Sequence, residues 1–171
     1  MKRYLSIVLL IGFWSCEEDK DTTVTLWGEE FSVENTTELN FRIFNNIDSP
    51  YNLSGEIPSE IGNLTNLTYL NLFGNQLSGP IPSELWNLVN LTYLNLGANQ
   101  LTGTISPEIS KMRNLNSLYL NDNQFTGELP ESICNLILDD NSTQLAYNKF
   151  CPPYPSCILD YVNDQDTSGC D

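Results

Sequence analysis

Histidine is absent from this sequence of 171 residues, and basic residues are scarce. Without histidine, several common general-base, nucleophile and metal-binding arrangements are excluded. Only seven Lys and Arg residues stand against 22 Asp and Glu residues, which gives a formal net charge of −15. Phosphate groups bind clustered cations, so this acidic balance argues against nucleic acid as a partner.

The sequence also lacks an apolar run of the roughly 20 residues that span a bilayer, so no transmembrane helix is expected. The apolar run that comes nearest, YLSIVLLIGFW, starts at Tyr4 and follows Lys2 and Arg3. A basic start, a short apolar run and the small Ser15 predict a signal peptide over residues 1–15. The rest of the chain has the length of one domain.

Cys16 follows this run, and the segment GFWSC resembles the lipobox of bacterial lipoproteins, although Phe13 and Trp14 depart from its usual residues. The resemblance implies that Cys16 is lipidated and that the protein is exported to the bacterial cell surface or outer membrane, with the lipid as its only membrane contact. The acidic residues after Cys16 resemble the surface-export signal of Bacteroidetes-type lipoproteins, and residues 16–23 should form a flexible tether. The alternative is an ordinary cleavable signal with a free thiol.

Four cysteines besides Cys16 lie near the end of the chain: Cys134, Cys151, Cys157 and Cys170. An even number of cysteines in an exported chain predicts two disulfides, and three pairings are open. Zinc is the competing interpretation. The spacing contains no C-x₂-C pair, and the chain has no histidine, so disulfides are preferred.

The segment NLTYLNLFGNQLSGPIPSEL, which starts at Asn66, is nearly repeated 24 residues later from Asn90. Apolar residues recur in seven columns with this period: Leu53, Leu77, Leu101, Phe125; Ile57, Ile81, Ile105, Leu129; Ile61, Leu85, Ile109, Ile133; Leu64, Leu88, Met112, Leu136; Leu67, Leu91, Leu115; Leu70, Leu94, Leu118; Leu72, Leu96, Leu120. Units with apolar residues in register bury their faces against their neighbours, which predicts a solenoid. The L-x-L step has the period of a strand.

Two further columns are polar or small. Asn75, Asn99 and Asn123 follow each strand, where a buried amide can satisfy backbone groups that the turn leaves unpaired. The other column is expected to need positive φ or close approach of coils, and it consists of Gly55, Gly79, Gly103 and Gly127.

The segment LTYLNLFGNQLSGPIPSELWNLVN resembles the leucine-rich repeat, and its L-S-G-x-I-P part resembles the plant-type subclass of receptor-kinase ectodomains and polygalacturonase inhibitors; bacterial surface proteins carry the same type. The resemblance implies an α/β-type repeat solenoid over residues 37–150. This would be a horseshoe of about five coils with parallel strands on the concave face and an irregular or 3-10 helical convex side. Residues 24–36 and 151–171 are expected to cap its ends, with the second cap containing the disulfides.

Side chains between the inward leucines should point outward from the strands. These candidate ligand-binding residues are Tyr69, Asn71, Phe73, Tyr93, Asn95, Ser117, Tyr119 and Asn121. Neighbouring strands lie about 4.8 Å apart, so Tyr69 and Tyr93 should stack. Exposed aromatic residues flanked by amides suit a protein or glycan partner. The function predicted is a monomeric, non-enzymatic binding module without cofactor or metal.

Alternatives remain for each part of this prediction. A regular array of small polar residues could order water or ice, as in some plant leucine-rich-repeat antifreeze proteins, but tyrosine and phenylalanine interrupt the concave face. A carboxylate pair could make a polysaccharide hydrolase, yet Glu60, Glu84 and Glu108 recur at one exposed repeat position. The acidic tail, Asp160, Asp164, Asp166 and Asp171, could bind calcium but lacks the EF-hand spacing.

Overall fold

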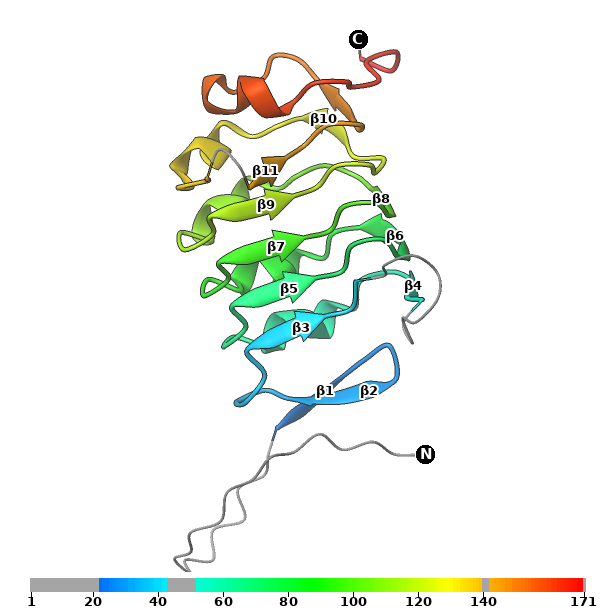
Figure 1. Cartoon of the computed structure of the whole chain (residues 1–171), viewed down its shortest axis with the longest axis vertical. Helices are drawn as coiled ribbons and strands as arrows, with labels where there is room; N and C mark the ends of the chain where they lie inside the picture. Colours follow the sequence, from blue (N-terminus) through cyan, green and yellow to red (C-terminus); the bar gives the residue numbers. More distant parts are fainter. Residues whose placement is uncertain (1–21, 43–51, 140–141, 171) are drawn as a thin grey trace, which may run out of the picture.

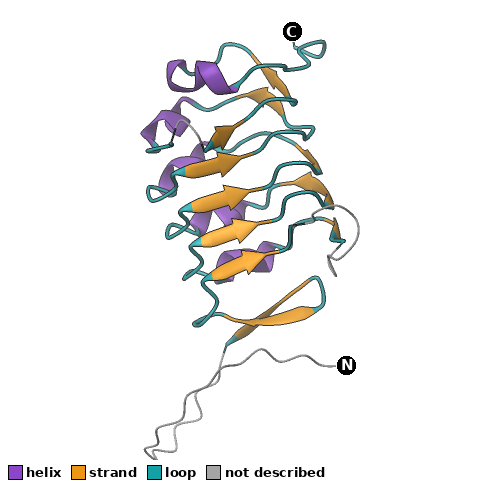
Figure 2. Ribbon diagram, viewed as in Figure 1, coloured by secondary structure: helices purple, strands orange, loops and turns teal. Residues whose placement is uncertain are grey.

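The computed structural model of the chain describes residues 22–42, 52–139 and 142–170. Successive coils stack along its long axis, and the strands of one sheet lie in register along one side (Figure 1). Short helices form a second side, and further strands form a third (Figure 2). The predicted α/β-type repeat solenoid is therefore confirmed.

The first sheet is parallel and has the strand order β11-β9-β7-β5-β3. Its strands are β3 (Glu38–Asn40), β5 (Tyr69–Asn71), β7 (Tyr93–Asn95), β9 (Ser117–Tyr119) and β11 (Thr143–Gln144). The register pairs Leu70 with Leu94 and Leu94 with Leu118, and all three are fully buried. Alternate side chains of a strand point to opposite faces, so the residues beside these leucines form the outer surface of the sheet, called the strand face below.

A second set of parallel strands lies on an adjacent side of the coils. It consists of β4 (Ser54–Gly55), β6 (Gln76–Pro80), β8 (Gln100–Thr102), β10 (Thr126–Glu128) and β12 (Lys149–Cys151). The backbone N–H of Thr126 donates to the Gly103 carbonyl at 2.8 Å, which joins the three strands β4, β6 and β8 to the pair β10 and β12. The second sheet therefore also runs the length of the repeats.

Each coil returns through a short 3-10 helix. These helices are η1 (Ser59–Asn63), η2 (Ser83–Asn87), η3 (Pro107–Lys111), η4 (Glu131–Asn135) and η5 (Ser156–Tyr161). A proline with extended backbone precedes all of them except η3. In η3, Ser106 is the N-cap and its hydroxyl accepts the Glu108 N–H at 3.2 Å, so the S-P order replaces the usual I-P order without losing the helix start.

The seven apolar columns are all buried, as predicted, and form one continuous core. The asparagine column lies beside this core: Asn75 Nδ2 donates to the carbonyls of Phe41 and Leu72, both at 2.9 Å, and its Oδ1 accepts the Leu53 N–H at 3.0 Å. Each amide thus links neighbouring coils through backbone groups that would otherwise be unsatisfied. The column continues to Asn148, which the sequence analysis did not include and which is 3% exposed.

Positive φ occurs in two columns of the repeat. Gly55, Gly79, Gly103 and Gly127 have φ between 74° and 82°, as expected. The second column follows β5, β7, β9 and β11 and was not predicted; it consists of Gly74, Ala98, Asp122 and Tyr147. Gly74 is the one glycine in this column, so the sequence did not indicate that the position needs positive φ. The other three coils adopt left-handed backbone there with Ala98, Asp122 and Tyr147.

The packing of η1 against η2 depends on Gly62. A Cβ atom at this position would lie 2.6 Å from both the Cβ and the backbone oxygen of Glu84. The corresponding residue of the next coil is Trp86, which is 2% exposed. The same repeat position therefore has two roles. In the first coil Gly62 allows the next coil to approach closely, and in the second coil Trp86 fills the core with its largest side chain.

The N-terminal end is covered by an antiparallel hairpin of β1 (Thr23–Leu26) and β2 (Glu29–Ser32). Trp27 and Gly28 form its two-residue turn with φ of 48° and 86°, which matches a type I′ hairpin. The Trp27 and Phe31 rings pack edge-on against Phe41 at centroid distances of 5.6 and 5.9 Å. Aromatic packing thus closes this end of the core.

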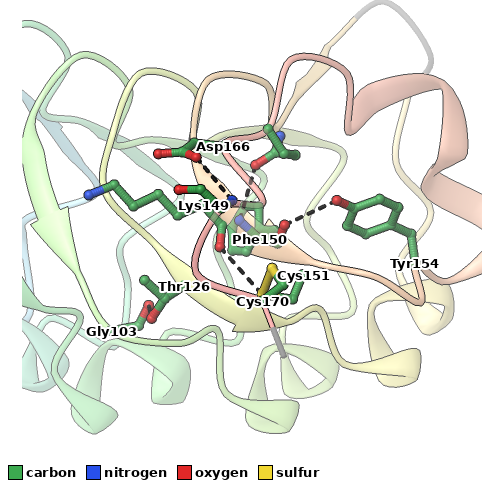
Figure 3. The surroundings of a disulfide bond; sticks show 10 residues. Gly103, Thr126, Lys149, Phe150, Cys151, Tyr154, Asp166 and Cys170 are labelled. Atoms are coloured by element: carbon green, nitrogen blue, oxygen red, sulfur yellow. Dashed lines mark hydrogen bonds between the residues drawn. A yellow bond between two sulfur atoms is a disulfide. The ribbon is translucent and has the colours of Figure 1, made fainter.

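The C-terminal end is held by two disulfides. Cys134 pairs with Cys157, and Cys151 pairs with Cys170, which selects one of the three open connectivities. Near the second bridge, the Tyr154 hydroxyl donates to the Phe150 carbonyl at 3.0 Å (Figure 3).

Several predictions concern residues outside the described ranges: the signal peptide, Cys16 with most of its tether, and the Asp171 end of the tail. Within the described ranges, every helix is too short and too polar to traverse a bilayer.

Candidate functional site

The strand face carries most of the predicted binding residues. Tyr69 lies beside Tyr93 in the register, and Tyr93 beside Ser117; Asn71 lies beside Asn95, and Asn95 beside Tyr119. Tyr69, Tyr93 and Tyr119 are half-buried, with part of each ring open to solvent. These residues therefore form two adjacent columns on the strand face, but their side chains are not equally accessible.

Three tyrosines form a continuous row across the sheet. The rings of Tyr69 and Tyr93 stack at a centroid distance of 4.4 Å and an interplanar angle of 12°. Tyr119 belongs to the neighbouring column, yet its ring reaches Tyr93 diagonally at 5.5 Å with an angle of 42°. We call Tyr69, Tyr93 and Tyr119 the tyrosine row.

The predicted exposure of Asn71 and Asn95 is wrong, since they are only 1% and 9% exposed. Asn71 donates to the Tyr69 hydroxyl at 3.1 Å, and its Oδ1 accepts the Phe73 N–H at 3.1 Å. Asn95 repeats the arrangement with Tyr93 at 3.1 Å and with the Gly97 N–H at 2.9 Å. A phenol two residues earlier thus covers each amide, which makes the asparagines positioning residues for the rings.

Phe73 and Asn121 lie over Gly97, a buried residue that the sequence analysis did not select. A Cβ atom at Gly97 would lie 3.2 Å from Phe73 Cδ2 and 3.0 Å from Asn121 Oδ1. The missing side chain therefore lets these two half-buried groups converge at the carboxyl ends of the strands. Ser117 is also half-buried, and its hydroxyl donates to Asn116 Oδ1 at 2.9 Å.

The environment of Tyr93, at the centre of the tyrosine row, favours its uncharged phenol. Burial raises the pKa of Tyr93 above its ordinary value of 10.0, and the hydrogen bond with Asn95 opposes this rise. The neighbouring phenols of Tyr69 and Tyr119 raise the pKa further. The folded structure therefore favours the protonated form of the Tyr93 hydroxyl.

The glutamates considered as catalytic groups lie elsewhere. Glu60, Glu84 and Glu108 are exposed in the first turns of η1, η2 and η3, one on each coil. Glu108 pairs with Lys111 at 3.3 Å, and the pair is half exposed. These positions form a solvated ridge on the helical side, in agreement with the sequence pattern.

Within the described ranges, the acidic and cysteine side chains do not gather in groups of three that could hold a metal ion. A pocket of about 190 Å³ opens between η4 and η5 beside the exposed Ile137, and its lining residues are aliphatic or cysteine apart from Tyr161. Charged side chains do not line it, so it offers no acid–base pair.

The second sheet presents a different surface with the same period. Gln76, Gln100 and Gln124 form an exposed column, and Gln76 Nε2 donates to Asn52 Oδ1 at 2.8 Å. Beside it runs an exposed to half-buried hydroxyl column of Ser54, Ser78, Thr102 and Thr126. We call these two columns the polar ladder. Aromatic residues do not interrupt it in the four coils that contain these residues.

Comparisons with known proteins agree with this architecture. Family models for leucine-rich repeats match residues 65–107, as two copies, and residues 114–136. A search of curated proteins finds no match.

Three solved structures with the same fold are plant proteins. The plant peptide hormone receptor RGFR1 in complex with RGF2 is 35% identical, with a TM-score of 0.59, over 65% of this chain and 18% of that chain. A chain of the BIR3–SERK2 complex from Arabidopsis thaliana is 28% identical, with a TM-score of 0.63, over 89% of this chain and 79% of that chain. A plant ice-binding protein is 36% identical, with a TM-score of 0.56, over 67% of this chain and 34% of that chain.

The chain belongs to the leucine-rich-repeat proteins, and its repeats are of the plant type. It spans only about a fifth of the receptor RGFR1 and a third of the ice-binding protein that it resembles.

Proposed function

We propose that the chain is a non-enzymatic module that binds a protein partner through the strand face. The observation that carries this proposal is the tyrosine row, whose rings are partly open to solvent yet fixed by the buried amides of Asn71 and Asn95. Rigid aromatic side chains lose little conformational entropy on binding and are common anchors in protein interfaces. The similar structures of a peptide hormone receptor in complex with RGF2 and of the BIR3–SERK2 complex support a protein ligand.

Ring geometry favours a protein over a glycan. Sugar rings pack against the flat faces of aromatic side chains, but Tyr69 and Tyr93 cover each other's inner faces in the 4.4 Å stack. The row therefore presents mainly ring edges and hydroxyls. Ring edges carry partial positive charge and attract carbonyl oxygens, which a peptide supplies at every residue.

The test compares two triple variants of the full chain on arrays of short peptides and of glycans. Changing Tyr69, Tyr93 and Tyr119 to Ala should abolish most peptide binding, since truncating an aromatic anchor often costs about 2 kcal/mol or more. Folding should weaken only modestly, by about 0.2–1 kcal/mol for each lost cross-strand pair. The matched control changes Glu60, Glu84 and Glu108 to Gln and should bind like the wild type. Equal losses in both variants, or binding confined to glycans, would contradict the proposal.

We also propose export with a lipid tether at Cys16. The two disulfides support an oxidising compartment, because such bonds rarely persist in the cytosol. Mass spectrometry of the native N-terminus decides the matter. An N-terminus other than Cys16, without an acyl mass, would contradict the tether.

The polar ladder supports a second candidate function, the binding of ordered water or ice. The register pairs Ser54 with Gln76 and Ser78 with Gln100, so hydroxyl and amide side chains lie side by side on strands about 4.8 Å apart. The ladder lacks the aromatic residues that interrupt the strand face. The similarity to a plant ice-binding protein is consistent with this candidate. Wild-type protein should then show thermal hysteresis, Thr102→Arg should abolish it, and Tyr93→Ala should retain it. Absence of hysteresis in the wild type would exclude this function.

A further inference from the structure

We infer that the strand face contains a subsite for a cationic side chain, formed by Glu38 and the outer face of the Tyr69 ring. The partner would present Lys or Arg at the step between β3 and β5. This inference rests on the proposed protein-binding function and specifies the chemistry of the ligand at one position.

The sheet register places the two groups side by side. Glu38 pairs with Tyr69, and the next residues, Leu39 and Leu70, are 3% and 0% exposed. Because alternate side chains point to opposite faces, Glu38 and Tyr69 both point outward, on strands about 4.8 Å apart.

Only one face of Tyr69 is available to a ligand. Tyr93 covers the inner face at 4.4 Å, and the bond from Asn71 to the Tyr69 hydroxyl fixes the ring. The opposite face is directed along the sheet toward β3 and therefore toward Glu38. A cation over the face of a tyrosine ring is attracted by the ring quadrupole.

The Glu38 carboxylate has no cation of its own in the described part of the chain. The Glu38 side chain is exposed and makes no hydrogen bond or ion pair there. Along β5, β7, β9 and β11, the outward positions carry neither Lys nor Arg, and Arg42, four residues after Glu38, has an interaction of its own. A partner's cation would therefore meet a carboxylate and an aromatic face on this part of the sheet.

The charge of the whole chain acts in the same direction. A net charge of −15 attracts basic segments over long distances and repels acidic ones. Long-range attraction increases the rate of encounter, whereas the Glu38–Tyr69 pair would select where the cation lies. A general attraction alone would not depend on any single carboxylate.

The experiment uses the full chain and an array of short peptides in which each sequence is printed in three versions. The versions contain Arg, the neutral isostere citrulline, or Glu at the same position. Wild type should bind a subset of sequences about two- to five-fold more strongly with Arg than with citrulline, as expected for an exposed cation–π contact or ion pair. Glu38→Gln should lose this preference, and Tyr69→Leu should reduce it.

Glu60→Gln is the matched control, because it removes one exposed carboxylate from the helical side and should keep the preference for Arg. Circular dichroism checks that each variant is folded. Two outcomes would overturn the cation subsite and leave the protein-binding function intact. In the first, wild type binds the Arg and citrulline peptides equally well. In the second, Glu60→Gln loses the preference for Arg as fully as Glu38→Gln does. Absence of peptide binding in the wild type would overturn both.

Discussion

The two ends of this solenoid are closed by different means. At the N-terminal end, the β1–β2 hairpin packs Trp27 and Phe31 edge-on against Phe41. At the C-terminal end, the described residues after β12 contain only η5 as regular structure and are held by two disulfides. The described part of the N-terminal cap has no cysteine at all.

This difference reflects what each segment can bury. The hairpin pairs its own backbone groups and contributes two large aromatic rings, so its packing can offset the entropy of ordering it. The C-terminal segment has little backbone pairing of its own, and it contributes Ile158 and Val162 to the core. Crosslinks reduce the entropy of its unfolded state and so replace part of the missing packing.

Removing both disulfides is the strongest test of this comparison. Reduction of the pairs Cys134–Cys157 and Cys151–Cys170 should cost about 2–5 kcal/mol for each bridge. Each coil packs only on its neighbours, so the loss should begin at the last coil. Leu118 and Leu120 donate their N–H groups to Ser142 and Gln144, and these amides should lose hydrogen-exchange protection first.

Hydrogen exchange of the N-terminal hairpin is the internal control for that measurement. The amides of β1 and β2 should keep their protection when the C-terminal bridges are reduced. An unchanged melting temperature, together with unchanged exchange at Leu118 and Leu120, would show that the bridges do not hold this end.

The reciprocal test removes Phe41, on which the N-terminal cap rests. Phe41→Ala should lower the free energy of unfolding by about 3–5 kcal/mol, because it leaves a cavity between the cap rings and the first coil. Urea unfolding measures the change. Leu159→Ala, at a side chain that is 55% exposed, should change stability by less than about 0.5 kcal/mol. Similar effects of the two substitutions would mean that the aromatic cluster does not anchor this end.

The smallest effect on stability is expected in the middle coils. Each of these coils packs on two neighbours and needs neither an aromatic cap nor a disulfide. The raised pKa of Tyr93 means that the folded protein holds this proton more tightly than the unfolded chain does. Its contribution to stability is present below about pH 10 and is lost as the pH rises through the folded-state pKa. Unfolding by urea from about pH 9 to pH 11 should show a steeper loss in wild type than in Tyr93→Phe.

Tyr147→Phe, at an exposed tyrosine near the C-terminal end, is the control for the alkaline measurement. Its pH dependence should match that of the wild type. Identical slopes for wild type and Tyr93→Phe would show that the environment of Tyr93 does not contribute to alkaline unfolding.

The sequence by itself determined the repeat, the buried columns and the outward direction of the tyrosines. A fixed period with apolar residues in register leaves few other ways to bury them. The stack of Tyr69 on Tyr93 followed from the period alone, because identical positions of parallel strands lie side by side. The aromatic cover over the first coil could also be predicted, since Trp27 and Phe31 are the aromatic residues of the predicted cap, residues 24–36.

Tertiary structure decided features that depend on contacts between different columns. Asn71 and Asn95 lie on the outward positions that the period predicts, but the phenols of Tyr69 and Tyr93 cover them. Strand alternation predicts the direction of a side chain and does not predict whether a neighbouring side chain buries it. Trp86 occupies a position where Gly62 stands one coil earlier, so the pattern could not place it inside or outside.

The disulfide pairing likewise required the structure, because four cysteines allow three connectivities and only the fold brings particular sulfur atoms together. The period fixes which face a residue occupies, whereas the shapes of neighbouring side chains fix whether that residue is accessible. For this protein, the sequence therefore identified the surface, and the packing of the tyrosine row decided which of its groups a partner can reach.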